Sequence, residues 1–133
     1  MADTDHTAPK PASTFTRERN SAAVIDFDDG VDFAAAAHGL IAQHPTGRIE
    51  KNGWPVWDTA NHDFLRTDDA APNTVHPGLW RQGKLNAIHG LFQVAEGVWQ
   101  ARGYDISNIT FIEADSGWLI IDPLTAEECA AAC

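Results

Sequence analysis

Short apolar runs separated by turn residues dominate the second half of the chain. The runs Phe92–Val94 and Val98–Gln100 flank one turn, and the runs Asn108–Glu113 and Trp118–Ile121 flank another. Turns of Gly, Asp and Ser between apolar segments of this kind are typical of antiparallel hairpins. Trp118–Ile121 contains no polar alternation, and we therefore expect a strand that is covered on both faces.

The first half of the chain contains one helical pattern and one hairpin pattern. Apolar residues at helical spacing predict a helix over Asp26–Gln43, with acidic residues at the end that the helix dipole favours. The Asn52-Gly53 pair supplies the positive φ angles of a two-residue turn, which predicts a hairpin of Ile49–Lys51 with Trp54–Trp57. The tryptophans of this hairpin either cover a core or form a stacking surface for a ligand, and we favour the core.

Two further helices are predicted from their end residues. Pro77–His89 has proline in its first turn and glycine directly after it, and we expect its apolar face to pack on the first hairpin. Thr125 and Glu128 have the spacing of a capping box, which predicts a helix that begins after Thr125. Cys129 and Cys133 lie one turn apart on this helix, and we interpret them as ordinary thiols.

Charge and composition narrow the class of protein. The chain has 133 residues, 44% of them hydrophobic, and a formal net charge of −10. This excess of acidic residues argues against binding to nucleic acid or to anionic membranes. No apolar run reaches the roughly 20 residues of a membrane span, and the N-terminal residues lack the apolar segment of a secretory signal. We expect a cytoplasmic protein whose residues 1–20, rich in Thr, Pro and charge, form a disordered tail.

Three segments of the second half resemble one enzyme family. They read LWRQGKLNAIHGLF, GVWQARGYDISNITFIEADSGW and LIIDPLTAEE. Together they resemble the alkyl sulfatases of the metallo-β-lactamase superfamily, which hydrolyse sodium dodecyl sulfate and similar sulfate esters. The resemblance is densest from Trp80 to Glu128. The Trp-Arg-Gln and Arg-Gly-Tyr-Asp-Ile-Ser-Asn pieces are specific to the sulfatases, whereas the Ile-Asp-Pro step is common across the superfamily.

The resemblance implies an α+β fold of the αββα type. We expect the disordered tail over residues 1–20, an N-terminal extension of helices and a hairpin over 21–89, and the first strands of a metallo-β-lactamase sandwich over 90–133. The sandwich would be incomplete within these residues, because the family domain is much longer.

The resemblance also implies a reaction and a cofactor for the whole family enzyme. It is expected to hold two zinc ions that activate water, to take a small alkyl sulfate as substrate and to form a homodimer. The family binds its metals through a His-x-His-x-Asp-His motif beyond the Asp-Pro-Leu step, and this sequence contains no His-x-His. We therefore expect no catalytic residue, no metal ligand and no hydrolysis from these 133 residues alone.

Two groups of residues near strand ends are candidates for a site. The polar loop between the last two predicted hairpins offers donors to a sulfate group or shapes the alkyl entrance, or it is only a connection built from turn formers. Its candidate residues are Arg102, Tyr104, Asp105, Ser107 and Asn108. Asp122 follows the strand Trp118–Ile121, and the resemblance implies that it supports the metal-binding loop. The alternative for Asp122 is an acid at a helix start.

Two other functions stay open at this point. Unpaired edges of the strand Trp118–Ile121 would suit a non-catalytic protein that pairs this strand with a partner. Another metallo-β-lactamase-type hydrolase, such as a lactamase-like or thioester hydrolase, would share the fold but act on a different substrate. The pieces Trp80-Arg81-Gln82 and Gly103-Tyr104-Asp105 favour the sulfatase over that hydrolase.

Overall fold

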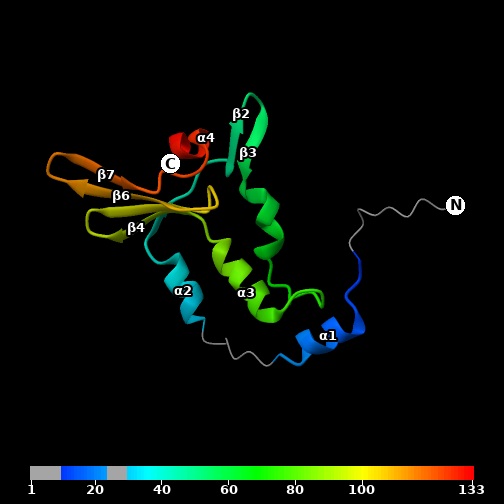
Figure 1. The fold of residues 1–133 in the computed structure, drawn as a ribbon. Coiled ribbons are helices and arrows are strands. Elements are labelled where there is room, and N and C mark those ends of the chain that lie inside the picture. Colours follow the sequence, from blue (N-terminus) through cyan, green and yellow to red (C-terminus); the bar gives the residue numbers. More distant parts are fainter. Residues whose placement is uncertain (1–9, 24–29) are drawn as a thin grey trace.

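The main body of the protein is an antiparallel sheet with helices at one side. The structure is a computed structural model that describes residues 10–23 and 30–133. Five strands follow the order β1-β4-β5-β6-β7 across the sheet (Figure 1). Their bounds are β1 Leu40–Ala42, β4 Gly90–Ala95, β5 Val98–Arg102, β6 Ile109–Ala114 and β7 Gly117–Ile121.

Two of the sheet's hairpins form where the turn residues predict them. β4 pairs with β5 and β6 pairs with β7, both antiparallel. Phe111 lies opposite Trp99 on one side and opposite Ile120 on the other, so large apolar side chains follow one another across a face of the sheet. Both hairpin predictions are confirmed, because turns of a few residues depend on local sequence alone.

A separate two-stranded sheet consists of β2 Arg48–Lys51 and β3 Trp54–Asp58. Asn52 and Gly53 have φ angles of 52° and 81°, as the predicted two-residue turn requires. The helix α4, Glu127–Ala132, contacts both strands and lies between this hairpin and the large sheet (Figure 1).

The core lies where α4, the β2–β3 hairpin and the large sheet meet. Its buried residues come from all three parts and are Ile49, Ala101, Tyr104, Ile109 and Cys129. Trp57 packs against this cluster, whereas Trp54 is 78% exposed. The core interpretation of the hairpin tryptophans is therefore right for Trp57 and wrong for Trp54.

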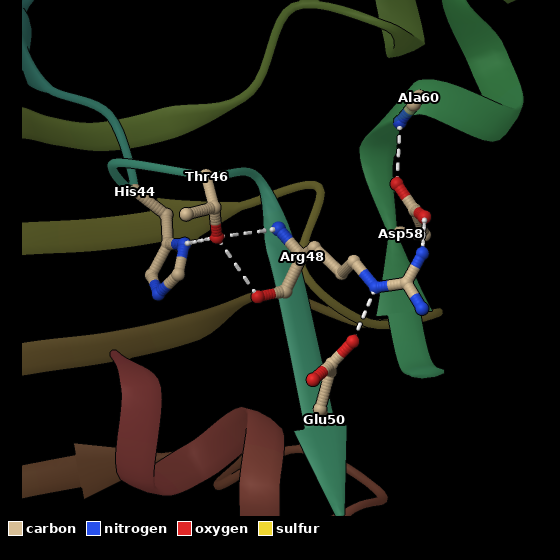
Figure 2. A network of polar contacts seen from close by, with 6 residues as sticks. All are labelled: His44, Thr46, Arg48, Glu50, Asp58 and Ala60. Atoms are coloured by element: carbon tan, nitrogen blue, oxygen red, sulfur yellow. Dashed lines mark hydrogen bonds and ion pairs between the residues drawn. The ribbon is translucent and has the colours of Figure 1, made fainter. Parts of the chain in front are cut away.

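Polar contacts hold the entry to the β2–β3 hairpin. Figure 2 shows the Arg48 guanidinium between two carboxylates, with Nε 2.5 Å from Glu50 and Nη1 3.2 Å from Asp58. The other carboxylate oxygen of Asp58 accepts from the Ala60 backbone N–H at 3.0 Å. Thr46 accepts from the backbone N–H of Arg48 and donates to its carbonyl oxygen. These contacts connect β2 to the segment that follows β3.

Three further helices and a 3₁₀ segment complete the described fold. They are α1 Thr14–Ser21, α2 Val31–Ala37, η1 Thr59–Leu65 and α3 Pro77–Asn86. The expectation of a disordered tail is wrong for α1, because Ser13 caps this helix by accepting from the backbone N–H of Thr16. Residues 1–9 of the expected tail lie outside the described residues.

The prediction of a single helix over Asp26–Gln43 is wrong. The helix α2 ends at Ala37, and Leu40–Ala42 form the strand β1, which pairs with β4. Pairing with a strand about fifty residues away overrides the helical spacing of the apolar side chains. The acidic residues at the expected helix start fall partly in residues 24–29, outside the described part. β1 belongs to the expected N-terminal extension and nevertheless joins the large sheet.

The helix α3 begins at Pro77 as predicted but ends three residues early, at Asn86. Its N-cap is His76, whose ring Nδ1 accepts from the Gly78 backbone N–H at 3.1 Å. The helix contacts α2 and η1, which lie beside it in Figure 1. Contact with the β2–β3 hairpin was expected instead. No helix among residues 10–23 and 30–133 is long and apolar enough to cross a membrane.

The strand β7 is at the edge of the sheet and is not covered on both faces as expected. Trp118, Leu119, Ile120 and Ile121 are between 50% and 59% exposed. β6 is its hydrogen-bonded neighbour within the described sheet. The continuous apolar run is typical of a strand with both faces covered. Among the described residues, none covers these side chains fully.

Phe92 on β4 provides a test of the sheet's packing. Its side chain is fully buried, with 0% exposure, beneath the Arg102 guanidinium at 4.4 Å from the ring centroid. We expect Phe92→Ala to lower the free energy of unfolding by about 3 kcal/mol, measured by urea denaturation, because the change leaves a cavity. Val94→Ala, at a position 52% exposed on the same strand, should cost much less. Equal losses would contradict this assignment.

Candidate functional site

A cavity lies between the helices and one end of the sheet. It has a volume of about 800 Å³ and is lined by α2, α3, η1, the end of β5 and the loop that follows β5. Three arginines from three different elements reach it, namely Arg66, Arg81 and Arg102. Two histidines and two asparagines add further polar atoms to its wall: His62, His89, Asn86 and Asn108. A cavity of this size and mixed lining is typical of a small-molecule site.

Contacts with the protein hold each of these arginines in place. Arg81 pairs with Asp32 of α2 at 2.7 Å. Arg66 pairs with Asp63 at 2.8 Å and donates to the Thr59 carbonyl oxygen at 2.9 Å. A guanidinium fixed in this way loses little further conformational entropy when it binds an anion.

Arg102 is held differently. Its Nε donates to the side-chain oxygen of Gln100 at 2.6 Å, and its guanidinium lies over the ring of Phe92. Hydrogen bonds to the described residues use only Nε, so the two terminal nitrogens keep their donors for a ligand. Arg102 is therefore the arginine of this cavity that is best prepared to receive an oxyanion.

The structure divides the five predicted loop candidates into two groups. Arg102, Asp105 and Asn108 line the cavity, whereas Tyr104 and Ser107 do not. The Tyr104 hydroxyl accepts from the His44 backbone N–H at 2.8 Å, and its ring packs edge-on against His89. Burial raises the pKa of the Tyr104 hydroxyl. Tyr104 therefore has a structural role, and His89 packs against its ring.

Asp105 is the structural centre of the loop. Its side chain is 7% exposed, and its two oxygens accept four hydrogen bonds. They come from the backbone N–H groups of Ile106, Thr125 and Ala126 and from the Thr125 hydroxyl at 2.6 Å. The carboxylate thereby joins the loop after β5 to the start of α4, twenty residues further along the chain.

These bonds explain why the predicted capping box does not form. Ala126 precedes α4 with no side-chain cap, because Asp105 engages both the hydroxyl and the N–H of Thr125. Glu128 instead forms an ion pair with Lys51 of β2. Burial by itself would raise the pKa of the Asp105 carboxyl, but the bonds from Thr125, Ile106 and Ala126 outweigh it and lower that pKa.

The backbone at Gly103 positions the same loop against the helices. Its φ is +79°, and a Cβ there would lie 2.5 Å from Cβ of His89, so no larger residue fits. The Gly103 carbonyl accepts from the indole N–H of Trp57 at 2.8 Å. Trp57 therefore packs on the core and fixes the loop that follows Arg102 and contains Asn108.

Asp122 lies outside the cavity, at the end of β7. It is exposed, has a φ of +52° and accepts from the Ser107 hydroxyl at 3.2 Å. It precedes Pro123 and a second residue with positive φ, Leu124 at +71°, so it does not start a helix. The role of supporting a metal-binding loop stays a prediction.

Metal ligands do not gather in the described residues. No group of three or more His, Cys, Asp or Glu side chains there could hold a metal ion. Cys129 is buried and Cys133 exposed, and both are free thiols. Burial is the largest cause of the raised pKa of the Cys129 thiol, which keeps it protonated at neutral pH. The interpretation as ordinary thiols is consistent with these positions.

The sequence analysis missed several cavity residues outside the loop. Arg66 follows η1, His62 lies within it, and Arg81 lies on α3. Arg81 stood within a segment that resembles the sulfatases, but Arg66 and His62 stood in a polar stretch without a motif. Only the packing of α2, η1 and α3 brings them to one cavity.

This α+β chain is similar in sequence to three alkylsulfatases. The chain is 41% identical to a linear primary-alkylsulfatase and 45% identical to an (R)-specific secondary-alkylsulfatase, both from Pseudomonas sp., over 92% of its length. It is 42% identical over 89% of its length to the alkyl/aryl-sulfatase BDS1 of Saccharomyces cerevisiae strain ATCC 204508 / S288c. No family model matches the sequence.

A solved structure agrees with these relatives. The stereoselective inverting sec-alkylsulfatase Pisa1 from Pseudomonas sp. matches 92% of this chain with a TM-score of 0.82 and 45% sequence identity. The predicted resemblance to alkyl sulfatases is confirmed. The chain spans 18–19% of the length of the curated relatives and 20% of the solved one.

Asp105 makes the loop's stability dependent on pH. We expect Asp105→Ala to lower the free energy of unfolding by about 2 kcal/mol, because it leaves buried N–H groups unpaired. Since its pKa is lowered in the folded state, the carboxylate's contribution is fully present above the unfolded value of roughly 4 and is lost as the pH falls through the folded value.

Chemical denaturation between pH 7 and pH 3 measures both effects. Asp115→Ala, in the exposed turn between β6 and β7, is the matched control and should leave the stability unchanged at pH 7. An Asp105→Ala variant that is as stable as the control would show that the Asp105 bonds do not hold the loop.

Proposed function

We propose that this chain is a segment of an alkyl sulfatase, an enzyme that hydrolyses alkyl sulfate esters to an alcohol and sulfate. The observation that carries the proposal is 41–45% identity over 89–92% of the chain to three sulfatases. The names of these relatives differ in the type of ester, but all three are sulfatases. The described residues supply an arginine-lined cavity and a rigid loop to such an enzyme, and the hydrolytic groups belong to the rest of it.

The proposal includes the fold of the whole enzyme. We propose that β4–β7 are the first strands of a metallo-β-lactamase sandwich and that the whole enzyme is a homodimer. Support comes from the antiparallel order of these strands and from the exposed apolar surface of β7, which suits a sheet that continues.

We also propose that the whole enzyme uses two zinc ions to activate water. The described residues do not fit this metal, since they contain no group of three suitable ligands. Its ligands are therefore assigned to the parts of the enzyme that these residues do not include. The role proposed for Asp122 beside that metal site rests on its place at the end of β7.

A segment exchange tests the proposed function. The matching segment of the Pseudomonas secondary-alkylsulfatase would be replaced by this chain, which is 45% identical to it over 126 residues. We expect the exchanged protein to hydrolyse secondary alkyl sulfates, measured as released sulfate, within about tenfold of the parent enzyme, a loss of about 1.4 kcal/mol of transition-state stabilisation. A chelator should abolish the activity, and added zinc should restore it.

The control is the same exchange with Asp105→Ala added. This variant should have a lower free energy of unfolding than the exchanged protein while its metal is still bound. A well-folded exchanged protein without hydrolysis would contradict the assignment to the sulfatases. Hydrolysis that continues after complete removal of metal would contradict the zinc proposal.

The edge strand β7 favours a second candidate function, in which the chain pairs with a second copy of itself. Four consecutive apolar residues, Trp118–Ile121, lie half exposed along an edge that bears no charged side chain. Antiparallel pairing of two such edges would join two sheets into one and bury these side chains.

The molecular mass in solution tests this pairing. The chain should be dimeric, and Leu119→Lys together with Ile121→Lys should make it monomeric by placing charges at the shared edge. Val94→Lys, on the interior strand β4, is the control and should leave the mass unchanged. A monomeric wild-type chain would exclude this candidate.

A further inference from the structure

We propose that the Asn52-Gly53 turn at the tip of the β2–β3 hairpin is a site of spontaneous covalent modification, in which Asn52 cyclises and becomes aspartate or isoaspartate. The modification consumes water and requires neither a cofactor nor a catalytic activity of the protein. It is separate from the proposed function, so its test does not depend on the hydrolysis of sulfate esters.

The reaction begins when the backbone nitrogen of Gly53 attacks Cγ of the Asn52 side chain. A new N–Cγ bond closes a five-membered succinimide ring, the Cγ–Nδ2 bond breaks, and ammonia leaves with the proton of the Gly53 nitrogen. Water then opens the ring at either of its carbonyl carbons. Opening at Cγ gives aspartate, whereas opening at the backbone carbonyl carbon gives isoaspartate, whose main chain runs through Cβ and Cγ.

The groups that react have no competing contacts among the described residues. Asn52 and Gly53 are both exposed, and neither the Asn52 side chain nor the Gly53 N–H forms a hydrogen bond there. A Cβ built on Gly53 would meet no heavy atom within 4 Å, so open space surrounds this residue. Because Gly53 itself has no side chain, its nitrogen is not shielded from Cγ of Asn52.

Few contacts hold the tip of the hairpin closed, and in Figure 1 the turn points away from the large sheet. Two pairs of opposite residues separate the turn from a shift in the strand register: Lys51–Trp54 and Glu50–Pro55. An exposed hairpin tip opens more readily than a packed strand, and opening lets Asn52 reach the Gly53 nitrogen. The attack is intramolecular, so the nucleophile has a high effective concentration whenever the turn opens.

The other five asparagines of the chain provide an internal comparison. Each of them precedes a residue with a side chain, which hinders attack by the backbone nitrogen of that residue. They are Asn20, Asn61, Asn73, Asn86 and Asn108. Two side chains are also held by hydrogen bonds, since Asn20 donates to the Asn73 carbonyl oxygen and Asn86 accepts from Gln82, each at 3.0 Å. Asn52 is therefore expected to react first.

Isoaspartate at this position alters the contact between the hairpin and α4. A two-residue turn needs a fixed backbone length, and isoaspartate adds one carbon atom to the main chain. The neighbouring Lys51 forms an ion pair with Glu128 of α4, and a new carboxylate at position 52 competes for this ammonium group. We expect the modified hairpin to hold α4 less firmly.

Incubation of the full chain in mildly alkaline buffer, followed by peptide mapping with mass spectrometry, tests the proposal. An asparagine that reacts exchanges its amide for a carboxyl group, so the mass of its peptide changes. We expect Asn52 to react about tenfold faster than the other asparagines, which corresponds to a barrier lower by about 1.4 kcal/mol. Hydroxylamine, which cleaves succinimides, should split the chain between residues 52 and 53. An unreacted Asn52, or a rate no higher than that of the other asparagines, would overturn the proposal.

Two variants separate the reaction from its effect on the hairpin. Asn52→Gln, incubated in parallel, should keep its mass, because its longer side chain would have to close a six-membered ring. Freshly prepared Asn52→Asp has the charge of one product and an unaltered backbone, and Asp-Gly suits the same turn. The isoaspartate form, separated by chromatography, should unfold at a lower urea concentration than Asn52→Asp.

The outcomes for the variants decide both parts of the proposal. Modification of Asn52→Gln at the rate of the wild-type chain would overturn the proposed reaction. An isoaspartate form as stable as Asn52→Asp would overturn the predicted loss of contact with α4.

Discussion

The buried carboxylate of Asp105 is the interaction on which this arrangement most depends. It accepts hydrogen bonds from Ile106, Thr125 and Ala126 and so connects the loop after β5 to the start of α4. A buried charge is costly unless hydrogen bonds satisfy it, and here the bonds are sufficient to lower its pKa. The helix α4, whose start Asp105 holds, contacts both strands of the β2–β3 hairpin and contributes Cys129 to the core.

The cavity depends on this contact indirectly. Arg102 precedes the loop that Asp105 holds, and Trp57 binds that loop at Gly103 from the other side. Three arginines therefore lie at one place in this acidic protein. Ion pairs with Asp63 and Asp32 hold Arg66 and Arg81, and the ring of Phe92 lies against Arg102. Cations of this kind can act on an anion locally even though the field of the whole molecule repels it. The apolar side chains of β7, at the edge of the sheet, are exposed at the surface.

Local sequence was sufficient for the hairpins and for the beginning of α3. Asn52 and Gly53 dictate a two-residue turn through their own backbone preferences, and Pro77 starts a helix for the same reason. Arg102, Asp105 and Asn108 were predicted as a site because polar residues were dense between two strands. The sequence could not separate their roles, since whether a carboxylate binds a ligand or a backbone N–H depends on which segment lies opposite.

The sequence by itself therefore determined the turns, the hairpins and the family resemblance, because these depend on residues close together along the chain. Only the tertiary structure decided that Leu40–Ala42 form a strand, since β4 supplies its hydrogen-bond partners from far away in the sequence. It also decided that Thr125 bonds to Asp105 rather than capping α4. Arg66 and Arg81 meet Arg102 for the same physical reason: packing between distant segments, which no local pattern encodes, brings their charges to one cavity.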